Sequence, residues 1–236
     1  RHCVLTNTQT KVKFVIVSWR NLPSVSINDP LLMLGKPAPL TAATGMDALT
    51  HAVEAYISKD ANPVTDAAAI QAIRLIARNL RQAVALGSNL QARENMAYAS
   101  LLAGMAFNNA NLGYVHAMAH QLGGLYDMPH GVANAVLLPH VARYNLIANP
   151  EKFADIAEFM GENIHGLSTM DAAESAICAI TRLSSDIGIP QHLSELGVKE
   201  ADFPYMAEMA LKDGNAFSNP RKGNEKEIVA IFRQAF

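Results

Sequence analysis

Residues 62–87, "NPVTDAAAIQAIRLIARNLRQAVALG", carry the clearest structural signal in the chain. Thr65 and Asp66 are typical of a helix start, and Gly87 is typical of a helix stop. Between them, apolar side chains recur every three or four residues, which is the period of one face of an α-helix. These side chains are Ile70, Ile73, Ile76, Leu80 and Val84. The stretch therefore predicts a long amphipathic helix.

The rest of the chain after residue 40 has the same character. Helix-like stretches with caps and apolar periodicity occur at residues 89–110, 149–161, 168–188 and 224–236. We expect eight to ten helices in total and no strand after residue 40. The sequence therefore predicts a mainly α fold, with an all-helical domain over residues 40–236.

The first 39 residues differ from this helical part. Residues 3–7, "CVLTN", and residues 13–19, "KFVIVSW", flank a polar turn and predict a β-hairpin. Residues 24–29, "SVSIND", alternate and predict a third short strand. A small isolated sheet is marginal in water. We therefore expect these strands to belong to a larger sheet whose other strands lie outside this sequence.

Composition narrows the class of protein. Of the 236 residues, 50% are hydrophobic and 17% are charged, and the net charge is −2, all typical of a globular domain. The few runs of basic residues are spread out along the chain, so nucleic acid is not an expected partner. No apolar run reaches the roughly 20 residues of a membrane span. The two cysteines, Cys3 and Cys178, exclude a disulfide framework and fit a reducing cytoplasm.

Histidines and one aspartate are spaced in a pattern that suits a metal site. Asp47 and His51 are four residues apart, as are His116 and His120, so each pair shares one helix face. His130 lies beside Pro129 and Gly131, at an expected helix start. Carboxylate and imidazole donors that converge suit a borderline divalent cation.

The spacing leaves alternatives open. A single histidine on a helix is more often a surface residue or a core residue with satisfied hydrogen bonds, and an Asp/His pair can simply support a helix. Spacing also does not say which of His116 and His120 is a ligand. For His140 we expect a structural position at the end of the amphipathic turn "AVLLPH", residues 135–140. Gly123 and Gly124 are interpreted as a helix stop rather than a phosphate loop, and neither a dinucleotide fingerprint nor a P-loop occurs in the sequence.

Several long motifs resemble those of the group III, iron-dependent alcohol dehydrogenases. They are "TAATGMDALTHAVEAYIS", "AGMAFNNANLGYVHAMAHQLGG", "MPHGVANAVLLPHV" and "NPRKGNEKEI". The resemblance extends over the whole chain. A narrower likeness, through "SWRNLPSVSINDPLLM" and residues 58–89, is to the alcohol dehydrogenase of bacterial ethanolamine utilization.

The resemblance implies a two-domain architecture of the dehydroquinate-synthase-like type. Residues 1–39 would be the remnant strands of an N-terminal α/β domain that binds the cofactor, and residues 40–236 the all-helical metal-binding domain. The family's glycine-rich pyrophosphate loop does not occur in this sequence. We therefore expect the chain to be the C-terminal portion of a longer protein, inactive by itself.

The resemblance also implies a role for individual residues. His120 would lie beside the nicotinamide and the substrate and act catalytically rather than as a ligand. Lys13 and Leu32 would contact the cofactor. The four implied metal ligands are Asp47, His51, His116 and His130.

The implied reaction interconverts a small primary alcohol and its aldehyde, ethanol and acetaldehyde being the expected pair. The expected cofactors are Fe2+, with Zn2+ as the alternative, and NAD, with NADP not excluded. A homodimer in the cytoplasm, or within a bacterial microcompartment, is also expected. Two other classes stay open: a non-catalytic helical metal-binding remnant, and a metal-dependent lyase like dehydroquinate synthase. Phe107, Asn108 and Asn109 near the site suit a neutral alcohol better than the lyase's charged sugar acid.

Overall fold

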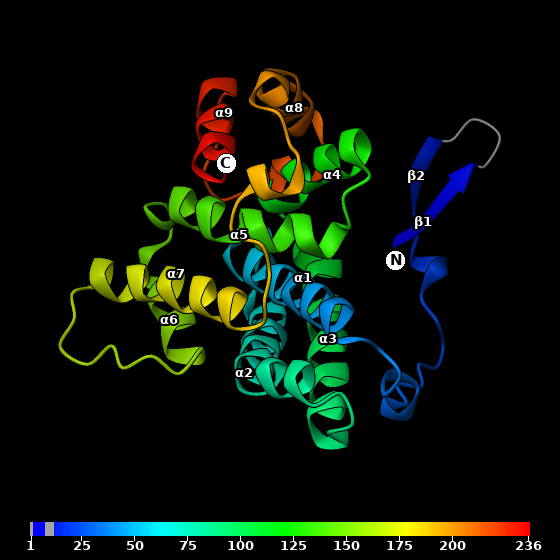
Figure 1. Cartoon of the computed structure of the whole chain (residues 1–236). Coiled ribbons are helices and arrows are strands. Elements are labelled where there is room, and N and C mark those ends of the chain that lie inside the picture. Colours follow the sequence, from blue (N-terminus) through cyan, green and yellow to red (C-terminus); the bar gives the residue numbers. More distant parts are fainter. Residues whose placement is uncertain (1, 8–11) are drawn as a thin grey trace.

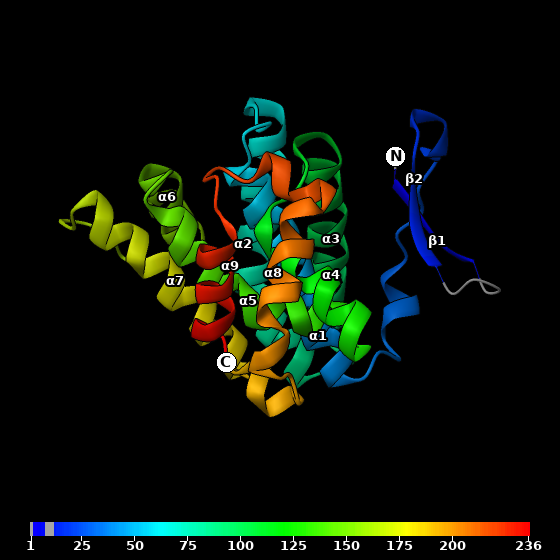
Figure 2. The same ribbon diagram turned by 90° about the horizontal axis from the view of Figure 1, so that it is seen from above.

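The computed structural model describes residues 2–7 and 12–236, with side chains from residue 16 onward. Strands β1 (His2–Asn7) and β2 (Val12–Val17) form an antiparallel pair in which Val4 faces Val15. These strands and residues 18–37 are called the arm. Residues 38–236 form the helical body, and the arm lies beside it in both views of the ribbon (Figure 1, Figure 2).

The body confirms the predicted mainly α fold. Short 3-10 helices also occur in the described residues: η1 (Trp19–Asn21) and η2 (Pro30–Met33) in the arm, and η3 (Leu193–Leu196), η4 (Glu200–Asp202) and η5 (Gly214–Ser218) in the body. The α-helices of the described residues are α1 (Ala38–Ile57), α2 (Pro63–Ala85), α3 (Leu90–Ala110), α4 (Tyr114–Tyr126), α5 (His130–Leu146), α6 (Pro150–Phe159), α7 (Thr169–Asp186), α8 (Phe203–Lys212) and α9 (Glu225–Gln234). No helix among these described residues is long and apolar enough to cross a bilayer.

Helix α2 shows how the predicted boundaries arise. Asn62 caps the helix, since its side chain accepts hydrogen bonds from the backbone N–H groups of Val64 and Thr65. The Thr65 hydroxyl in turn accepts from the backbone N–H of Asn62, which completes a capping box. The helix therefore begins at Pro63, two residues before the predicted start, because proline suits the first helical position.

Three local predictions were wrong. Residues 24–29 form no strand: the sheet of the described residues contains β1 and β2 alone, and residues 24–29 pair with neither of them. Gly123 and Gly124 lie inside α4, which ends at Asp127 in the left-handed conformation with φ of 51°. Helix α5 continues past Pro139 and His140 to Leu146, so His140 does not end it.

Helix α1 is the centre of the body. It is buried on nearly all sides and packs against α2, α3 and α5. Small residues allow close packing: a Cβ on Gly45 would lie 2.2 Å from Cδ1 of Leu80 on α2. A Cβ on Gly131 of α5 would lie 2.4 Å from the backbone oxygen of Ala43. The first approach holds α1 against α2, and the second holds α1 against α5, the two helices that carry three of the predicted ligands.

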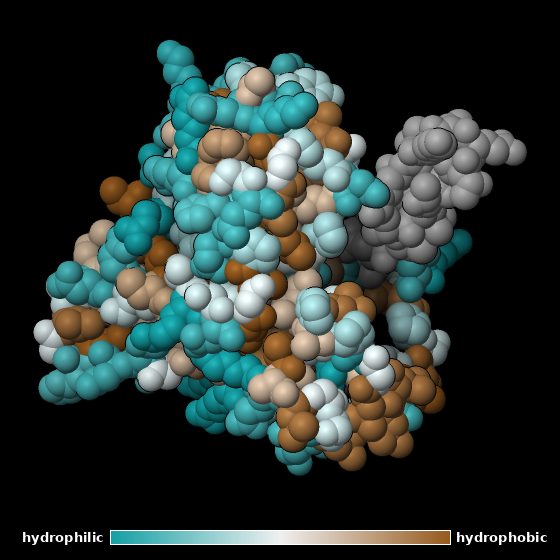
Figure 3. All heavy atoms as spheres, viewed as in Figure 1, coloured by the Kyte–Doolittle hydropathy of each residue, from teal (hydrophilic) through white to brown (hydrophobic). Residues whose placement is uncertain are grey.

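The arm is joined to the body by a buried arginine. Arg93 of α3 is 0% exposed and donates to the backbone oxygens of Lys36 and Gly87 and to the hydroxyl of Thr41. Many apolar side chains of residues 16–34 are exposed, and brown, hydrophobic spheres gather at the lower right of the space-filling view (Figure 3). The exposed apolar residues of residues 16–34 are Ile16, Val17, Trp19, Leu22, Val25, Ile27, Leu31 and Leu32.

Candidate metal centre

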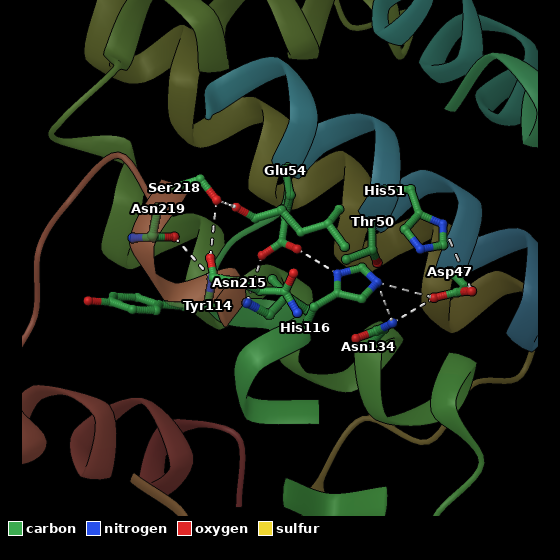
Figure 4. Close-up of polar contacts among 12 residues, drawn as sticks. Asp47, Thr50, His51, Glu54, Tyr114, His116, Asn134, Asn215, Ser218 and Asn219 are labelled. Atoms are coloured by element: carbon green, nitrogen blue, oxygen red, sulfur yellow. Dashed lines mark hydrogen bonds and ion pairs between the residues drawn. The ribbon is translucent and has the colours of Figure 1, made fainter. Parts of the chain in front are cut away.

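Three helices bring the predicted ligands together. Asp47 and His51 extend from one face of α1, His116 lies in the first turn of α4, and His130 is the first residue of α5. Donor atoms of Asp47, His51 and His116 all lie within 4.8 Å of one another. Figure 4 shows these side chains pointing toward one another between α1 and α4. The expected helix start at His130 is confirmed.

The distances around Asp47 define the cluster. Oδ1 of Asp47 lies 3.8 Å from Nε2 of His116 and 3.7 Å from Nε2 of His130. Oδ2 of Asp47 lies 4.0 Å from Nδ1 of His51. The carboxylate therefore stands among three imidazole rings that come from three different helices.

The amide of Asn134 lies within this cluster. Its Nδ2 is 2.6 Å from Oδ1 of Asp47, 3.2 Å from Nε2 of His116 and 3.1 Å from Nε2 of His130. An amide nitrogen has only two hydrogens for these three acceptors. The Oδ1 atom of Asn134 is buried with no hydrogen-bond partner in the described part of the chain. The cluster is therefore rich in lone pairs and short of donors.

Ring contacts and a buried carboxylate orient His116. Its ring stacks on that of His51, with centroids 4.6 Å apart, and His51 stacks in turn on Phe107 at 4.5 Å. Glu54 of α1 lies 2.6 Å from Nδ1 of His116 through its Oε2 atom, and both side chains are 2% exposed. Nε2 of His116 is thereby directed toward Asp47.

The electrostatics of the cluster favour cation binding. Burial works to raise the pKa of the Asp47 carboxyl, but three neighbouring histidines and the Asn134 amide outweigh it and hold that pKa below its ordinary value. Burial and the nearby His116, only partly opposed by Asp47, lower the pKa of His51 to about 3. Near pH 7 the site therefore offers a carboxylate and a neutral imidazole, which are the protonation states that bind metal ions.

His120 is held by a different carboxylate. Its Nδ1 lies 2.7 Å from Oδ2 of Asp213, which precedes η5. Oδ1 of Asp213 accepts from the backbone and side-chain nitrogens of Asn215. Burial works to raise the pKa of the Asp213 carboxyl, but its hydrogen bonds with His120 and Asn215 lower it overall. The His120 ring is stacked on that of His130, with centroids 5.6 Å apart.

The residues at this site fit a divalent cation. One carboxylate oxygen and two imidazole nitrogens lie within 3.2 Å of one amide nitrogen that has two hydrogens, and the neighbouring Oδ1 has no partner among the described residues. A cation would satisfy these acceptor atoms. One carboxylate and three imidazoles are the donor types of Fe2+ and Zn2+ sites. The assignment of Asp47, His51, His116 and His130 as ligands stays a prediction that this geometry supports.

Two of the predicted cofactor residues, Lys13 and Leu32, belong to the arm. Leu32 is 85% exposed and lies in η2, which packs against α3. The Lys13 side chain lies outside the described residues, although its backbone pairs with Thr6. Their role in cofactor binding therefore stays a prediction.

The sequence motifs did not predict Glu54, Asn134 and Asp213 as residues of the site. Glu54 follows His51 by three residues and Asn134 follows His130 by four, so helical spacing could have revealed both. Asp213 is 93 residues from His120, and no local pattern connects them.

Comparisons with known proteins identify the family to which the chain belongs. Residues 41–236 match the model of the Fe-containing alcohol dehydrogenase family, C-terminal. The chain is 95% identical over its whole length to 1,3-propanediol dehydrogenase of Citrobacter freundii, of which it covers 61%. It is 51% identical over 98% of its length to the NAD-dependent methanol dehydrogenase of Bacillus methanolicus, of which it also covers 61%. A crystal structure of 1,3-propanediol oxidoreductase superposes with a TM-score of 0.98 at 93% identity, covering 100% of this chain and 62% of that one.

Two consequences follow from these matches. The chain spans about 61% of the length of these curated relatives. The narrower likeness to the ethanolamine-utilization enzyme is not supported, because the relative at 95% identity is a 1,3-propanediol dehydrogenase. The expected microcompartment, which depended on that likeness, loses its support as well.

Proposed function

Because the chain belongs to the Fe-containing alcohol dehydrogenase family, we propose that it holds the divalent cation of an enzyme that interconverts alcohols and aldehydes. The observation that carries the proposal is the convergence of three acceptor atoms on the Asn134 amide nitrogen, beside a buried oxygen that has no partner in the part of the chain that the structure describes. A cation satisfies such a cluster, whereas a purely structural cluster would supply more donors. The proposed ligands are Asp47, His51, His116 and His130.

The proposed cation is Fe2+, with Zn2+ as the alternative. Both accept imidazole and carboxylate donors, and the family's name favours iron. The bound ion would supply Lewis-acid polarisation of the substrate C–O bond. The chain's part is to present one carboxylate and neutral imidazoles from three helices that are packed tightly enough to keep their geometry.

His120 is proposed to hold and pass a proton. Its Nδ1 donates to Asp213, which leaves Nε2 as the basic atom of the ring. The side chain is 42% exposed, so a proton can pass between Nε2 and solvent. A histidine positioned in this way suits general acid–base exchange with an alcohol hydroxyl.

A small neutral alcohol is the proposed substrate. The 95%-identical relative is named for 1,3-propanediol, so that diol is the first substrate to test, ahead of ethanol. NAD is the proposed cofactor, supported by the name of the methanol dehydrogenase relative, with Lys13 and Leu32 as proposed contacts. The carboxylates beside the site's histidines are Asp47, Glu54 and Asp213, and this negative charge disfavours the charged sugar acid of a lyase. A dimer stays a prediction that analytical ultracentrifugation would test.

Metal analysis tests the proposed site. Purified chain loaded with Fe2+ without oxygen, or with Zn2+, should retain about one ion, and Asp47→Ala and His130→Ala should each lose it. His165→Ala is the matched control, because that histidine is exposed in the segment between α6 and α7. Full metal occupancy in both ligand variants would contradict the assignment.

A second measurement tests His120. In the intact protein, His120→Ala should keep its metal while turnover of 1,3-propanediol falls by about 10²- to 10⁴-fold, the usual contribution of general acid–base catalysis. Loss of metal as complete as in His116→Ala would instead make His120 a ligand.

A further inference from the structure

Glu54 is a buried carboxylate that the proposed function leaves without a role. It lies on α1 one turn beyond His51, on the helix face that also carries Asp47. The side chain is 2% exposed. A carboxylate in such a position is costly unless both oxygens are well hydrogen-bonded. Its partners therefore indicate why it is there.

Both oxygens of Glu54 contact α4. Oε1 accepts the backbone N–H of Val115 at 2.7 Å, and Oε2 lies 2.6 Å from Nδ1 of His116. A carboxylate only accepts hydrogen bonds, so Nδ1 of His116 carries the hydrogen. The lone pair is then on Nε2, on the side of the ring that faces Asp47 at 3.8 Å. Glu54 thus selects the tautomer that a metal ion needs.

The same contacts fix the beginning of α4. The N-cap residue Gly113 has no side chain to cap the helix. Oδ1 of Asn219 accepts from the backbone N–H of Tyr114 at 3.1 Å, and Glu54 accepts the next N–H. A Cβ at Gly113 would lie 2.8 Å from Oδ1 of Asn219 and 2.9 Å from Oε1 of Glu54. The turn that carries His116 is therefore capped by two segments that are distant in the sequence (Figure 4).

We propose that Glu54 is the positioning residue of the metal centre, which holds His116 in its Nδ1–H tautomer and aims Nε2 at the cation. The inference rests on the proposed metal site. Glu54 is not itself a ligand, because it contacts the ring nitrogen opposite to the one that faces Asp47. It acts through His116, as carboxylates that accept from a metal-bound imidazole do.

The variant Glu54→Gln separates positioning from simple capping. Glutamine has nearly the same size but only one acceptor oxygen. It can still cap Val115, yet its NH2 group then faces Nδ1 of His116, which moves the ring hydrogen to Nε2. In the full chain with 15N-labelled histidine, the metal-free wild type should show His116 as the Nδ1–H tautomer, and E54Q should show the Nε2–H tautomer. Zn2+ affinity, measured by competition with a chelator, should fall about 10- to 100-fold in E54Q.

Two control variants bracket this result. Asp155→Asn removes another carboxylate bound to α1, through the Tyr56 hydroxyl at 2.8 Å, and should leave Zn2+ affinity and the His116 tautomer unchanged. Asn219→Ala removes the other cap of α4 and should lower thermal stability without changing the tautomer. Equal tautomer changes in N219A and E54Q would make Glu54 a cap only and overturn the proposal.

Three further results would overturn the role proposed for Glu54. An Nε2–H tautomer of His116 in metal-free wild type would overturn the proposal without any variant, even if E54Q failed to fold. Equal Zn2+ affinity in wild type and E54Q would overturn the role of Glu54 alone. Wild type that binds no Zn2+ would overturn the metal site itself, and the inference with it.

Discussion

The arm and the helical body differ in the burial of their apolar side chains. In the body, Leu80 and Met46 are 0% exposed, and α1 is covered on nearly all sides. In the arm, Ile27 is 87% exposed and Val25 is 76% exposed. Burial of apolar area stabilises a fold by about 25 cal/mol per Å². Stability should therefore reside in the body, which also contains all the proposed metal ligands.

The largest expected effect contrasts two leucines. Leu80→Ala should lower the free energy of unfolding by about 2–5 kcal/mol, because it leaves a cavity against Gly45 in the core. Leu32→Ala in the arm should change it by less than about 0.5 kcal/mol, since that side chain is exposed. Urea denaturation followed by circular dichroism measures both. Similar losses in the two variants would show that the arm and the body unfold as one unit.

A second prediction concerns two glycines within the body. Gly131→Ala should cost about 1–3 kcal/mol, because the new methyl group meets the rigid backbone of Ala43 and pushes α5 away from α1. Zn2+ affinity should fall too, since His130 is the adjacent residue. Gly124→Ala is the matched control: nothing lies within 4 Å of its Cβ, and alanine should stabilise α4 by about 0.5–1 kcal/mol. Unchanged stability and Zn2+ affinity in Gly131→Ala would refute the close helix contact.

The third prediction concerns the loss of folding stability at acidic pH. Burial, with His192 and Arg143 nearby, lowers the pKa of His140 in the body from 6.5 to about 4. Between these values the unfolded chain binds a proton that the folded chain does not, so stability falls as pH drops from 6.5 to about 4. His140→Gln should remove a share of that loss, on the order of 2 kcal/mol after allowance for partial exposure. Urea midpoints at neutral and acidic pH provide the measurement, and an unaltered pH dependence would count against it.

The smallest expected effect comes from the arm. Trp19 is the single tryptophan of the chain and is 61% exposed in η1. Its emission should already resemble that of a solvated indole and should change little when the helices unfold. Urea titrations followed by tryptophan fluorescence and by circular dichroism test this. A large emission shift that coincides with the helical transition would mean that the arm packs against the body.

Much of the fold could be predicted from local sequence. The helix at residues 63–85 follows from apolar period and capping residues, and the pairing of β1 with β2 follows from two strand-like stretches around a polar turn. The predicted strand at residues 24–29 was wrong, because an alternating sequence pattern does not by itself supply a neighbouring strand to pair with. The predicted helix stop at Gly123 and Gly124 was wrong, because the packing of α4 against α5 and α8 outweighs the low helix propensity of two glycines.

The metal site likewise combines features that follow from local sequence with features that depend on long-range contacts. Local spacing was enough to predict that Asp47 and His51, and likewise His116 and His120, share helix faces, because four residues is close to one helical turn. Three features became visible only in the folded chain. Helices α1, α4 and α5 meet at the site, His120 pairs with Asp213, and Glu54 binds the His116 ring nitrogen that faces away from Asp47. Those contacts join residues 62 and 93 positions apart, and a local period contains no information about such pairs. They depend on how helices with buried glycines pack, which is a property of the assembled core.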